Sequence, residues 1–585
     1  MLRMNEPGKG RKDEEQLKSE VLSRFSADLV GGAAAVDASS KAHRIEGQVG
    51  SFLDSRECYY AHQRGGEFIR WKTEEVPAGT GAANVIFAFS MGTGLGSALP
   101  EPSGWFELHL NGSKLLSFRV TKEDMLWQGG GARLFYNVKQ VRFAEPGLSL
   151  CIDSHIRQEH TASFGIGFLF VPKSAVAEGK AATLEVRAMC RQPSERWFKL
   201  DVGPWSRPVA KAHLDKGIAA VSSPPSPQTM DGRLVLFGDI HAHSGHGTEE
   251  IRGCGTGTID ENYLYARDVS SLDLFALADH DWQMPTEADW RLRLDKADEY
   301  DESGRFVALP CFEWTSPGYG HRNVYFRKAD GPLFYSSKGI NVIEPDNQTP
   351  EELWAGLRAA KADAITVAHH PNVTVFAVDW SYRDPHFDRL VEIYSSWGNS
   401  EYLGAPYAGT ACDREPGIGV LDALLAGHRL GILASSDGHD GDPGNAQWSN
   451  RQRHIKHHLG SGLIAVLADE FSRDAVYDAM YQRRCYATTG VRILMDFSAN
   501  GELMGSETKP SQGEKVVLRF RVRGTTDLHK VELLENGGIL WRDLDIGCPA
   551  IDGEFETKPS PGSFYHLRVS QRDGEMAWSS PIWID

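Results

Sequence analysis

Two histidines that directly follow an apolar, strand-like run place the strongest constraint on the fold of this chain. The run at residues 234–237 leads through Gly238 to His241 and His243, which are two positions apart. Side chains at this spacing project from the same face of an extended segment, so both imidazoles can bind one metal ion. Most isolated pairs of this kind are loop histidines without a metal. Support for a metal site therefore has to come from elsewhere in the chain.

Side chains of metal-binding types also follow four later apolar runs. These runs begin near residues 272, 306, 363 and 431, and helix-like segments separate them. In chain order, the side chains that follow them are Asp279, His280, Glu313, His369, His370, Asp437 and His439. A β/α barrel gathers its functional groups at the C-terminal ends of its strands. The recurrence therefore predicts about seven β/α units that close into a barrel around one site.

The chain is expected to hold several domains, because 585 residues are enough for three or four. Alternating apolar runs before residue 210 and after residue 490 are typical of antiparallel sheets, and Asn111-Gly112 predicts a tight hairpin. Capping boxes predict helices that begin after Thr258 and Thr349. The expected order is a loosely ordered segment at 1–41, an N-terminal β-sandwich at 42–220, a Pro/Ser-rich linker at 221–231, a barrel at 232–490 and a small C-terminal β-sandwich at 491–585.

Five tryptophans in the N-terminal part allow two interpretations. Exposed aromatic rings in a row can bind a sugar, whereas buried rings contribute to the core of a sandwich. The five residues are Trp71, Trp105, Trp127, Trp197 and Trp205. Core positions are the more common outcome for residues of this type.

Composition argues against nucleic acids and membrane surfaces as partners. The 62 basic and 79 acidic side chains give a formal charge of −17, whereas those surfaces attract basic proteins. No apolar stretch approaches the roughly 20 residues that span a bilayer, and the first residues lack the apolar core of a secretion signal. The eight cysteines include no Cys-x-x-Cys pair, which favours reduced thiols. We therefore expect a cytoplasmic protein.

The order of these motifs resembles that of the PHP superfamily, named for polymerase and histidinol phosphatase. The matching segments are residues 238–243, 278–280, Glu313, 320–323, 369–371 and 436–439. Within that superfamily, the segments at 391–395, 398–401, 484–490 and 577–583 resemble the DUF3604 branch. The resemblance covers roughly residues 232–585. It implies a distorted (β/α)7 barrel with up to three divalent ions at its mouth, and the hydrolysis of phosphate esters.

The resemblance also implies how the ligands are shared among the ions. His241, His243, Glu313 and Asp437 are expected to hold the first ion, Glu313 to bridge to a second ion held by His321 and His370, and His280 and His439 to hold a third. His370 is preferred to His369 because the family ligand directly precedes proline. Mixed imidazole and carboxylate ligands suit Zn, Mn or Fe, and a pair of such ions about 3.5 to 4 Å apart can activate water for hydrolysis.

Three further residues are expected to act in catalysis. Asp279 should orient a ligand histidine, His369 adjoins a ligand, and Arg322 should grip an anionic group with its two-pronged guanidinium. Arg252 and Arg414 are the other candidates for the anion, although arginines of this kind are more often surface residues.

The sequence departs from the family pattern at two places. The usual Thr-Asp-His reads Ala278-Asp279-His280, and the acid expected about five residues after His243 is replaced by Thr248. Either the third ion takes another ligand or the cluster holds two ions. The alternative ligands are Glu249, Glu250 and His246.

Three functions remain open on the sequence alone. The leading one is a metal-dependent hydrolase of a phosphate mono- or diester. A second keeps the metal cluster but cleaves a sulfate ester on a sugar, because both oxyanions are tetrahedral. A third is a glycan-binding protein with a vestigial barrel, against which the near-complete ligand set argues. The expected substrate is a small anionic ester, such as a phosphorylated or sulfated sugar.

Overall fold

The computed structural model describes most of the chain after residue 226 and the strands of the part before it. After residue 226 it describes all residues except 248–252, 256, 338–347, 409–414, 440, 442, 445–461, 511–512 and 573. Before residue 227 it describes 15, 18–19, 21–23, 26–31, 35–38, 42–44, 57–62, 67–94, 103–121, 134–142, 149–157, 162–188 and 197–201. The linker expected at 221–231 therefore lies outside the described residues up to residue 226, as does most of segment 1–41.

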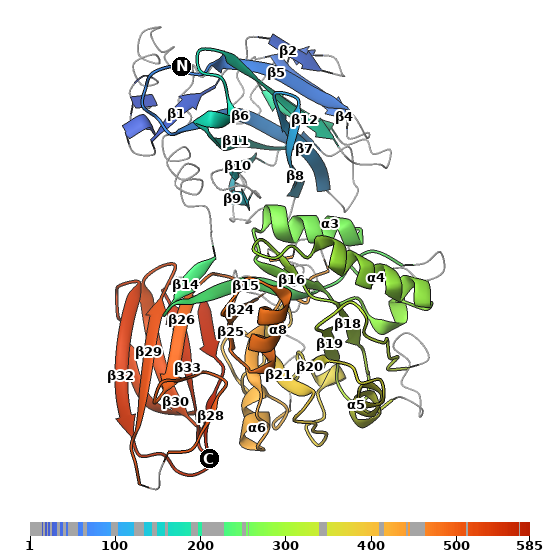
Figure 1. Cartoon of the computed structure of the whole chain (residues 1–585), viewed down its shortest axis with the longest axis vertical. Coiled ribbons are helices and arrows are strands. Elements are labelled where there is room, and N and C mark those ends of the chain that lie inside the picture. Colours follow the sequence, from blue (N-terminus) through green and yellow to red (C-terminus); the bar gives the residue numbers. More distant parts are fainter. Residues whose placement is uncertain are drawn as a thin grey trace. The chain divides into compact units, whose positions relative to one another are not determined.

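The chain divides into two compact units, which are considered separately (Figure 1). One comprises Met1–Ser226 with Asp268–Ser271, and the other comprises Pro227–Arg267 with Leu272–Asp585. No helix among the described residues has the length and apolar character needed to cross a bilayer.

The first unit consists of two sheets. The eight-stranded sheet contains β1 (Ala27–Val30), β3 (Ala42–Arg44), β4 (Glu57–His62), β6 (Asn84–Gly94), β9 (Leu134–Arg142), β10 (Ser149–Arg157), β11 (Ala162–Pro172) and β13 (Trp197–Asp201). The five-stranded sheet contains β2 (Ala35–Ala38), β5 (Phe68–Glu75), β7 (Ser103–Leu110), β8 (Ser113–Thr121) and β12 (Ala181–Ala188). The hairpin predicted at Asn111-Gly112 is confirmed, because both residues have positive φ and connect antiparallel β7 and β8.

Trp71 belongs to the core of this unit. Its side chain is buried, and its ring centroid lies 5.5 Å from that of Phe89 on the other sheet. The side chains of Trp105, Trp127, Trp197 and Trp205 lie outside the described residues, so the sugar-platform interpretation stays a prediction.

The second unit is built on a 12-stranded sheet. Its strands are β14 (Gln228–Met230), β15 (Arg233–Ala242), β16 (Leu274–Leu277), β17 (Val307–Ala308), β24 (Leu463–Ala468), β25 (Cys485–Thr488), β28 (Glu507–Thr508), β30 (Leu528–Glu535), β31 (Gly538–Leu544), β33 (Phe564–Gln571), β34 (Met576–Ser579) and β35 (Ile582–Ile584). Because β25 pairs with β34, the sheet runs without a break from the metal-ligand motifs into the C-terminal strands. One hydrophobic cluster accordingly spans Phe237, Tyr486 and Leu567.

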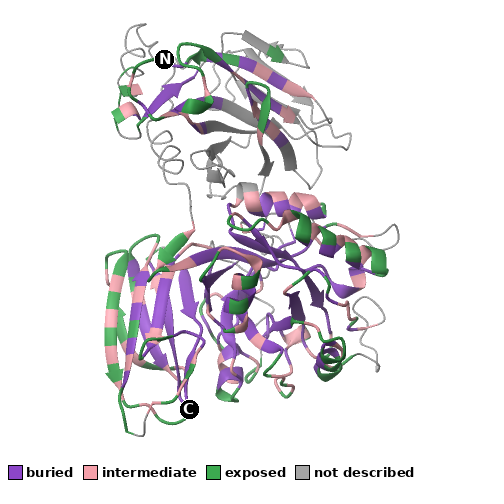
Figure 2. Ribbon diagram, in the orientation of Figure 1, coloured by how far each residue is buried: buried purple, intermediate pink, exposed green. Residues whose placement is uncertain are grey.

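Two smaller sheets complete this unit. The six-stranded sheet contains β18 (Cys311–Trp314), β19 (Arg322–Phe326), β20 (Ala364–Ala368), β21 (Asp388–Ser395), β22 (Gly398–Asn399) and β23 (Gly431–Ala434). The four-stranded sheet contains β26 (Leu494–Ala499), β27 (Glu502–Leu503), β29 (Val516–Arg523) and β32 (Ala550–Thr557). Figure 2 shows that most strands of the unit are buried, while β32 alternates between partly buried and exposed residues.

The described residues of the second unit form five α-helices, which are 6 to 14 residues long. They are α3 (Ile259–Leu264), α4 (Glu287–Tyr300), α5 (Pro350–Ala359), α6 (Val420–Leu425) and α8 (Arg473–Tyr481). Both predicted capping boxes are confirmed: Thr258 and Glu261 cap α3, and Thr349 and Glu352 cap α5. Each box satisfies amide groups that the first helical turn leaves without a partner.

The closed (β/α)7 barrel expected from the sequence is not supported. Several neighbours are antiparallel, among them β15 with β24 and β18 with β19, so the strands form open sheets. Pro310 separates β17 from β18, and proline has no N–H to continue a ladder. Isolated β-bridges connect Ala242 to Gly438 and His280 to Glu313. The 12-stranded and six-stranded sheets therefore meet at these points.

Candidate metal centre

Side chains of the types that bind metals gather where the 12-stranded and six-stranded sheets meet. His241 lies near the end of β15, Glu313 is in β18, and Asp437 follows β23. The structure places all of the proposed metal ligands in one buried cluster: His241, His243, His280, Glu313, His321, His370, Asp437 and His439. His369, expected beside a ligand, lies in the same cluster.

The carboxylate of Glu313 is the centre of this cluster. Five imidazole nitrogens lie within 3.5 Å of its oxygens: His321 Nδ1 at 2.8 Å and His369 Nε2 at 3.4 Å from Oε1, and His280 Nδ1 at 3.1 Å, His243 Nε2 at 3.3 Å and His241 Nε2 at 3.5 Å from Oε2. Burial opposes ionisation, but the neighbouring imidazoles hold the pKa of Glu313 well below its usual range. Glu313 is therefore an anionic oxygen donor surrounded by nitrogen donors.

Asp437 supplies a second carboxylate beside the same nitrogen of His243 that Glu313 contacts. Its Oδ1 lies 3.0 Å from His243 Nε2 and 3.4 Å from His241 Nε2. Trp397 donates a hydrogen bond from Nε1 to Oδ2 at 2.5 Å, which fixes the carboxylate. Asp437 and His370 both have positive φ, of 49° and 33°, a strained conformation that is characteristic of functional sites.

The donor atoms form four overlapping groups, each with its atoms within 4.8 Å of one another. The groups are His241/His243/Asp437, His241/Glu313/His369, His321/His369/His370 and His243/His280/His439. Both members of the 369–370 pair take part, so the sequence-based preference for His370 over His369 has no counterpart in the geometry. His369 lies in two groups, and its Nε2 is 3.4 Å from Oε1 of Glu313.

The residues present fit a metal cluster. Several buried ring nitrogens have no hydrogen-bond partner among the residues that the structure describes: His241 Nε2, His243 Nδ1, His321 Nε2, both nitrogens of His369, and His370 Nδ1. Leaving so many polar atoms buried and unpaired is costly, whereas a neutral imidazole nitrogen is a good ligand for divalent ions. Burial lowers the pKa of His369 to about 4 and that of His370 well below its ordinary value, so both rings are neutral, as ligation requires.

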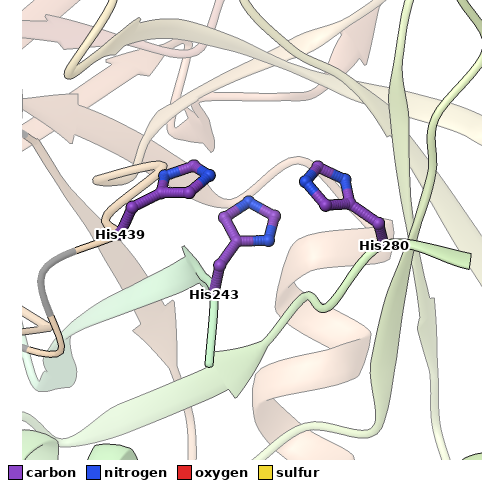
Figure 3. A group of neighbouring side chains, drawn as sticks. All are labelled: His243, His280 and His439. Carbon is purple, nitrogen blue, oxygen red and sulfur yellow. The ribbon is translucent and has the colours of Figure 1, made fainter. Parts of the chain in front are cut away.

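His243, His280 and His439 form a group of imidazoles on their own. Figure 3 shows the His243 ring between the other two. Its centroid lies 4.4 Å from that of His280 and 4.3 Å from that of His439. The ring of Trp282 stacks on that of His280, with the two centroids 4.9 Å apart.

Asp279 and Arg322 occupy positions that differ from the sequence-based expectation. Asp279 accepts hydrogen bonds from the amide and hydroxyl of Ser244, both at 2.7 Å, and from Arg293 at 2.8 Å, rather than contacting a ligand histidine. It therefore fixes the backbone that follows His243.

Arg322 is fully buried in β19 and does not reach the cluster. Its guanidinium lies 5.5 Å from the ring of Trp354 and 3.8 Å from Asp388, and it donates to the carbonyl of Tyr319 at 3.3 Å. His321, which directly precedes β19, contacts Glu313 at 2.8 Å, whereas the neighbouring Arg322 contacts neither carboxylate of the cluster. The expectation that Arg322 binds a substrate anion is therefore corrected. Its side chain packs against Trp354 of α5 instead.

The other expected candidates are only partly described. Arg252, Arg414, Thr248, Glu249 and Glu250 lie outside the described residues. His246 is described, but it belongs to none of the four donor groups found there.

Sequence reasoning missed two residues of the centre. Glu392, in β21, lies 3.0 Å from Nδ1 of His241 and is fully buried. Cys254 forms hydrogen bonds with His280 and His439; although desolvation opposes the shift, these bonds lower the pKa of the Cys254 thiol to about 6. Neither Glu392 nor Cys254 stands at a spacing in the sequence that relates it to the histidines.

Comparison with known proteins finds similarity in the region of this centre. Residues 270–378 and 427–519 match a family described as "Protein of unknown function (DUF3604)". Proteins described as uncharacterized from Chlamydia trachomatis serovar D and Chlamydia pneumoniae are 29% identical over 380 residues and 28% identical over 389 residues. Each match covers 60% of this chain and 57% of the relative, so the chain spans little more than half the length of these relatives.

Similarity to solved structures is slight. A two-domain protein from Bacteroides vulgatus, described as containing a predicted PHP-like metal-dependent phosphoesterase, is 14% identical with a TM-score of 0.30, covering 61% of this chain and 97% of that one. A TM-score this low supports no conclusion about fold or activity. The DUF3604 match is the more specific finding. It includes Glu313, His321 and Asp437, but it begins at residue 270 and therefore does not include His241 and His243.

Proposed function

We propose that this chain is a metal-dependent hydrolase that cleaves phosphate mono- or diesters at a cluster of two or three divalent ions. The observation that carries the proposal is the position of Glu313. One buried carboxylate with five imidazole nitrogens within 3.5 Å is a donor set for more than one ion. A carboxylate that only stabilised the fold would need one or two partners.

The four donor groups support a division of ligands among the ions. His241, His243 and Asp437 would hold the first ion. Glu313 would bridge it to a second, held by His321 with His369 or His370, and His280 with His439 would hold a third. Mixed nitrogen and oxygen donors suit Zn, Mn or Fe. When bound, such ions supply a nucleophilic water at neutral pH and positive charge for the oxygens of the ester.

Residues around the ligands would keep them in place for this reaction. Trp397 donates to one oxygen of Asp437, which leaves the other directed at His243. The ring of Phe376 lies 4.8 Å from that of His321, and Trp397 lies 5.4 Å from His370. These rings would shield one side of the cluster from water, which strengthens the electrostatic interactions there.

The substrate would be a small anionic ester, such as a phosphorylated or sulfated sugar. The cluster would attract it despite the acidic chain, because bound ions are often the largest local charges in a site. Phosphate is preferred over sulfate here because a phosphate monoester carries more negative charge for the ions to neutralise.

The experiment is a screen of the full chain, freed of metal and reloaded separately with Zn²⁺, Mn²⁺ or Fe²⁺. Matched nitrophenyl phosphate monoester, phosphate diester and sulfate ester would serve as substrates, and elemental analysis would follow metal content. We expect two or three ions per chain and hydrolysis of a phosphate ester that chelation abolishes and metal restores. Fewer than about one ion per chain, or turnover of the sulfate ester alone, would contradict the proposal.

A further inference from the structure

The donor group His243, His280 and His439 contains no carboxylate of its own, although Glu313 Oε2 lies 3.1 Å from His280 Nδ1 and Asp437 Oδ1 lies 3.0 Å from His243 Nε2. Its donor atoms lie within 4.8 Å of one another, and His280 and His439 are more than nine-tenths buried. Glu313 also contacts His321 and Asp437 also contacts His241, so both carboxylates are shared with the rest of the cluster and an ion held by His280 and His439 has no anionic ligand of its own. An anionic ligand would complete this group, and Thr248, the residue at the position where an acid was expected, cannot supply one.

The loop at 253–255 is pressed against the backbone of this site. A Cβ on Gly253 would lie 2.3 Å from the carbonyl carbon of Gly245, and a Cβ on Gly255 would lie 2.0 Å from the carbonyl oxygen of His243. The Gly255 amide also donates to the carbonyl of Ser244 at 2.9 Å. Only residues without a side chain allow this approach. Cys254 is therefore held beside the site by the two glycines that flank it.

The sulfur of Cys254 faces the imidazole group. It forms hydrogen bonds with both His280 and His439. A sulfur atom that contacts two candidate ligands of one ion lies where a third ligand of that ion would lie. The cysteine side chain is also exposed, so an ion could reach it from solvent.

We propose that Cys254 is the anionic ligand of an ion held by His280 and His439. The inference rests on the proposed metal-dependent function, because it assumes that ions bind at this centre. Two imidazoles and one thiolate, with the fourth position open to water, are a donor set for tetrahedral zinc. A soft thiolate in place of a hard carboxylate would make this position select Zn²⁺ over Mn²⁺ or Mg²⁺.

The test uses the full chain loaded with Co²⁺, which replaces zinc and reports its ligands by absorption. A thiolate ligand gives a charge-transfer band in the near ultraviolet that nitrogen and oxygen ligands do not give. We expect this band in the parent protein, its loss in Cys254→Ser, and its retention in Cys548→Ser. Cys548 is a matched control because it is also an exposed free thiol, and it lies between β31 and β32.

Thiol protection provides a second readout that needs no enzymatic activity. Bound Zn²⁺ should slow the alkylation of Cys254 by iodoacetamide at least about tenfold, as peptide mass mapping would show, and leave Cys548 unaffected. Cobalt binding without the charge-transfer band would overturn this inference and leave the proposed hydrolase standing. Failure to bind cobalt at all would overturn both.

Discussion

Nδ1 of His241 lies 3.0 Å from Oε2 of Glu392, and both side chains are fully buried. A proton held between these atoms fixes the orientation of the ring. Nε2 of His241, for which the described part of the chain offers no hydrogen-bond partner, then faces Glu313 at 3.5 Å and Asp437 at 3.4 Å. Burial raises the pKa of Glu392 to about 7, so its proton balance depends on the imidazole beside it. Glu392 is thus a positioning residue for the candidate ligand His241.

Replacing Glu392 with alanine should weaken metal binding while leaving the other ligands in place. Partners of this kind typically contribute about 10- to 100-fold to metal affinity, because they fix the tautomer and direction of the ligating ring. Competition with a chromophoric chelator would measure the loss. Glu392→Gln, which keeps an acceptor oxygen for Nδ1, should lose less than Glu392→Ala. Equal affinity in the parent and the alanine variant would show that His241 does not depend on Glu392.

Replacing Glu313 with glutamine should weaken the binding of more than one ion. The substitution removes one negative charge and one strong oxygen donor but leaves the volume of the side chain nearly unchanged. We expect a folded protein with reduced metal content and a hydrolytic rate lower by at least about a hundredfold, equivalent to roughly 2.7 kcal/mol of transition-state stabilisation. Elemental analysis and the ester assay would measure both effects.

Glu554→Gln is the matched control for that variant. Glu554 is an exposed residue that pairs with Arg519 at 2.7 Å on β32, so the same chemical change there should leave metal content and rate unaltered. Full metal content and full activity in Glu313→Gln would show that the centre of the site has been misassigned.

The sequence predicted which side chains come together more completely than it predicted the sheets that bring them together. Residues of metal-binding types that directly follow apolar runs, such as His280 after β16 and Asp437 after β23, can be recognised from the local sequence. Glu392 and Cys254 are not, because their contacts depend on which strand and which loop pack against the histidines in three dimensions.

The barrel could not be read from the sequence because alternation and length identify a strand but not its partner. The apolar run at β18 is followed by a short turn and β19, which folds back as an antiparallel neighbour. Continuous apolar runs of this kind are equally consistent with parallel and antiparallel pairing when both faces are buried. The N-terminal hairpin was predictable because Asn111-Gly112 favours one tight turn.

Breaking the ion pair between Glu401 and Arg568 should destabilise the second unit. Glu401 accepts hydrogen bonds from Arg568 at 2.7 Å and from Trp578 at 2.9 Å, and it links the segment after β22 to β33 and β34. Removing one partner of a buried pair leaves the other charge uncompensated, at a typical cost of about 3 to 5 kcal/mol. Because Arg568 also contacts Glu532 at 2.8 Å, we expect Glu401→Ala to fall near the lower end.

Urea denaturation of the parent and Glu401→Ala would measure this change in the free energy of unfolding. Glu554→Ala is the control, since an exposed ion pair contributes less than about 1 kcal/mol. A loss in Glu401→Ala no larger than in the control would show that the pair does not hold these strands together.

Limited proteolysis should spare the connection between β25 and β26. β25 pairs with β24 on one side and with β34 on the other, and the Tyr486 hydroxyl donates to the carbonyl of Ile493 at 2.8 Å. Backbone held in a sheet on both sides cannot enter a protease active site without local unfolding. Mass spectrometry of a short trypsin digest should therefore show no early cut at residues 488–500. Dominant cutting there would contradict the continuity of the sheet.

Stability should fall below about pH 6.5 partly because of His566. This residue is buried in β33, its Nδ1 has no hydrogen-bond partner in the described ranges of the chain, and burial together with Arg568 lowers its pKa to about 3. Above about pH 6.5 the ring is neutral in both states; below it, the unfolded chain takes up a proton that the folded protein refuses. The free energy of unfolding should therefore decrease by about 1.4 kcal/mol per pH unit from this group, down to about pH 3. In His566→Gln, urea denaturation at pH 7.5 and pH 5.5 should show a difference smaller than in the parent by roughly that amount. Identical pH dependence in the two proteins would mean that His566 takes up its proton in the folded state.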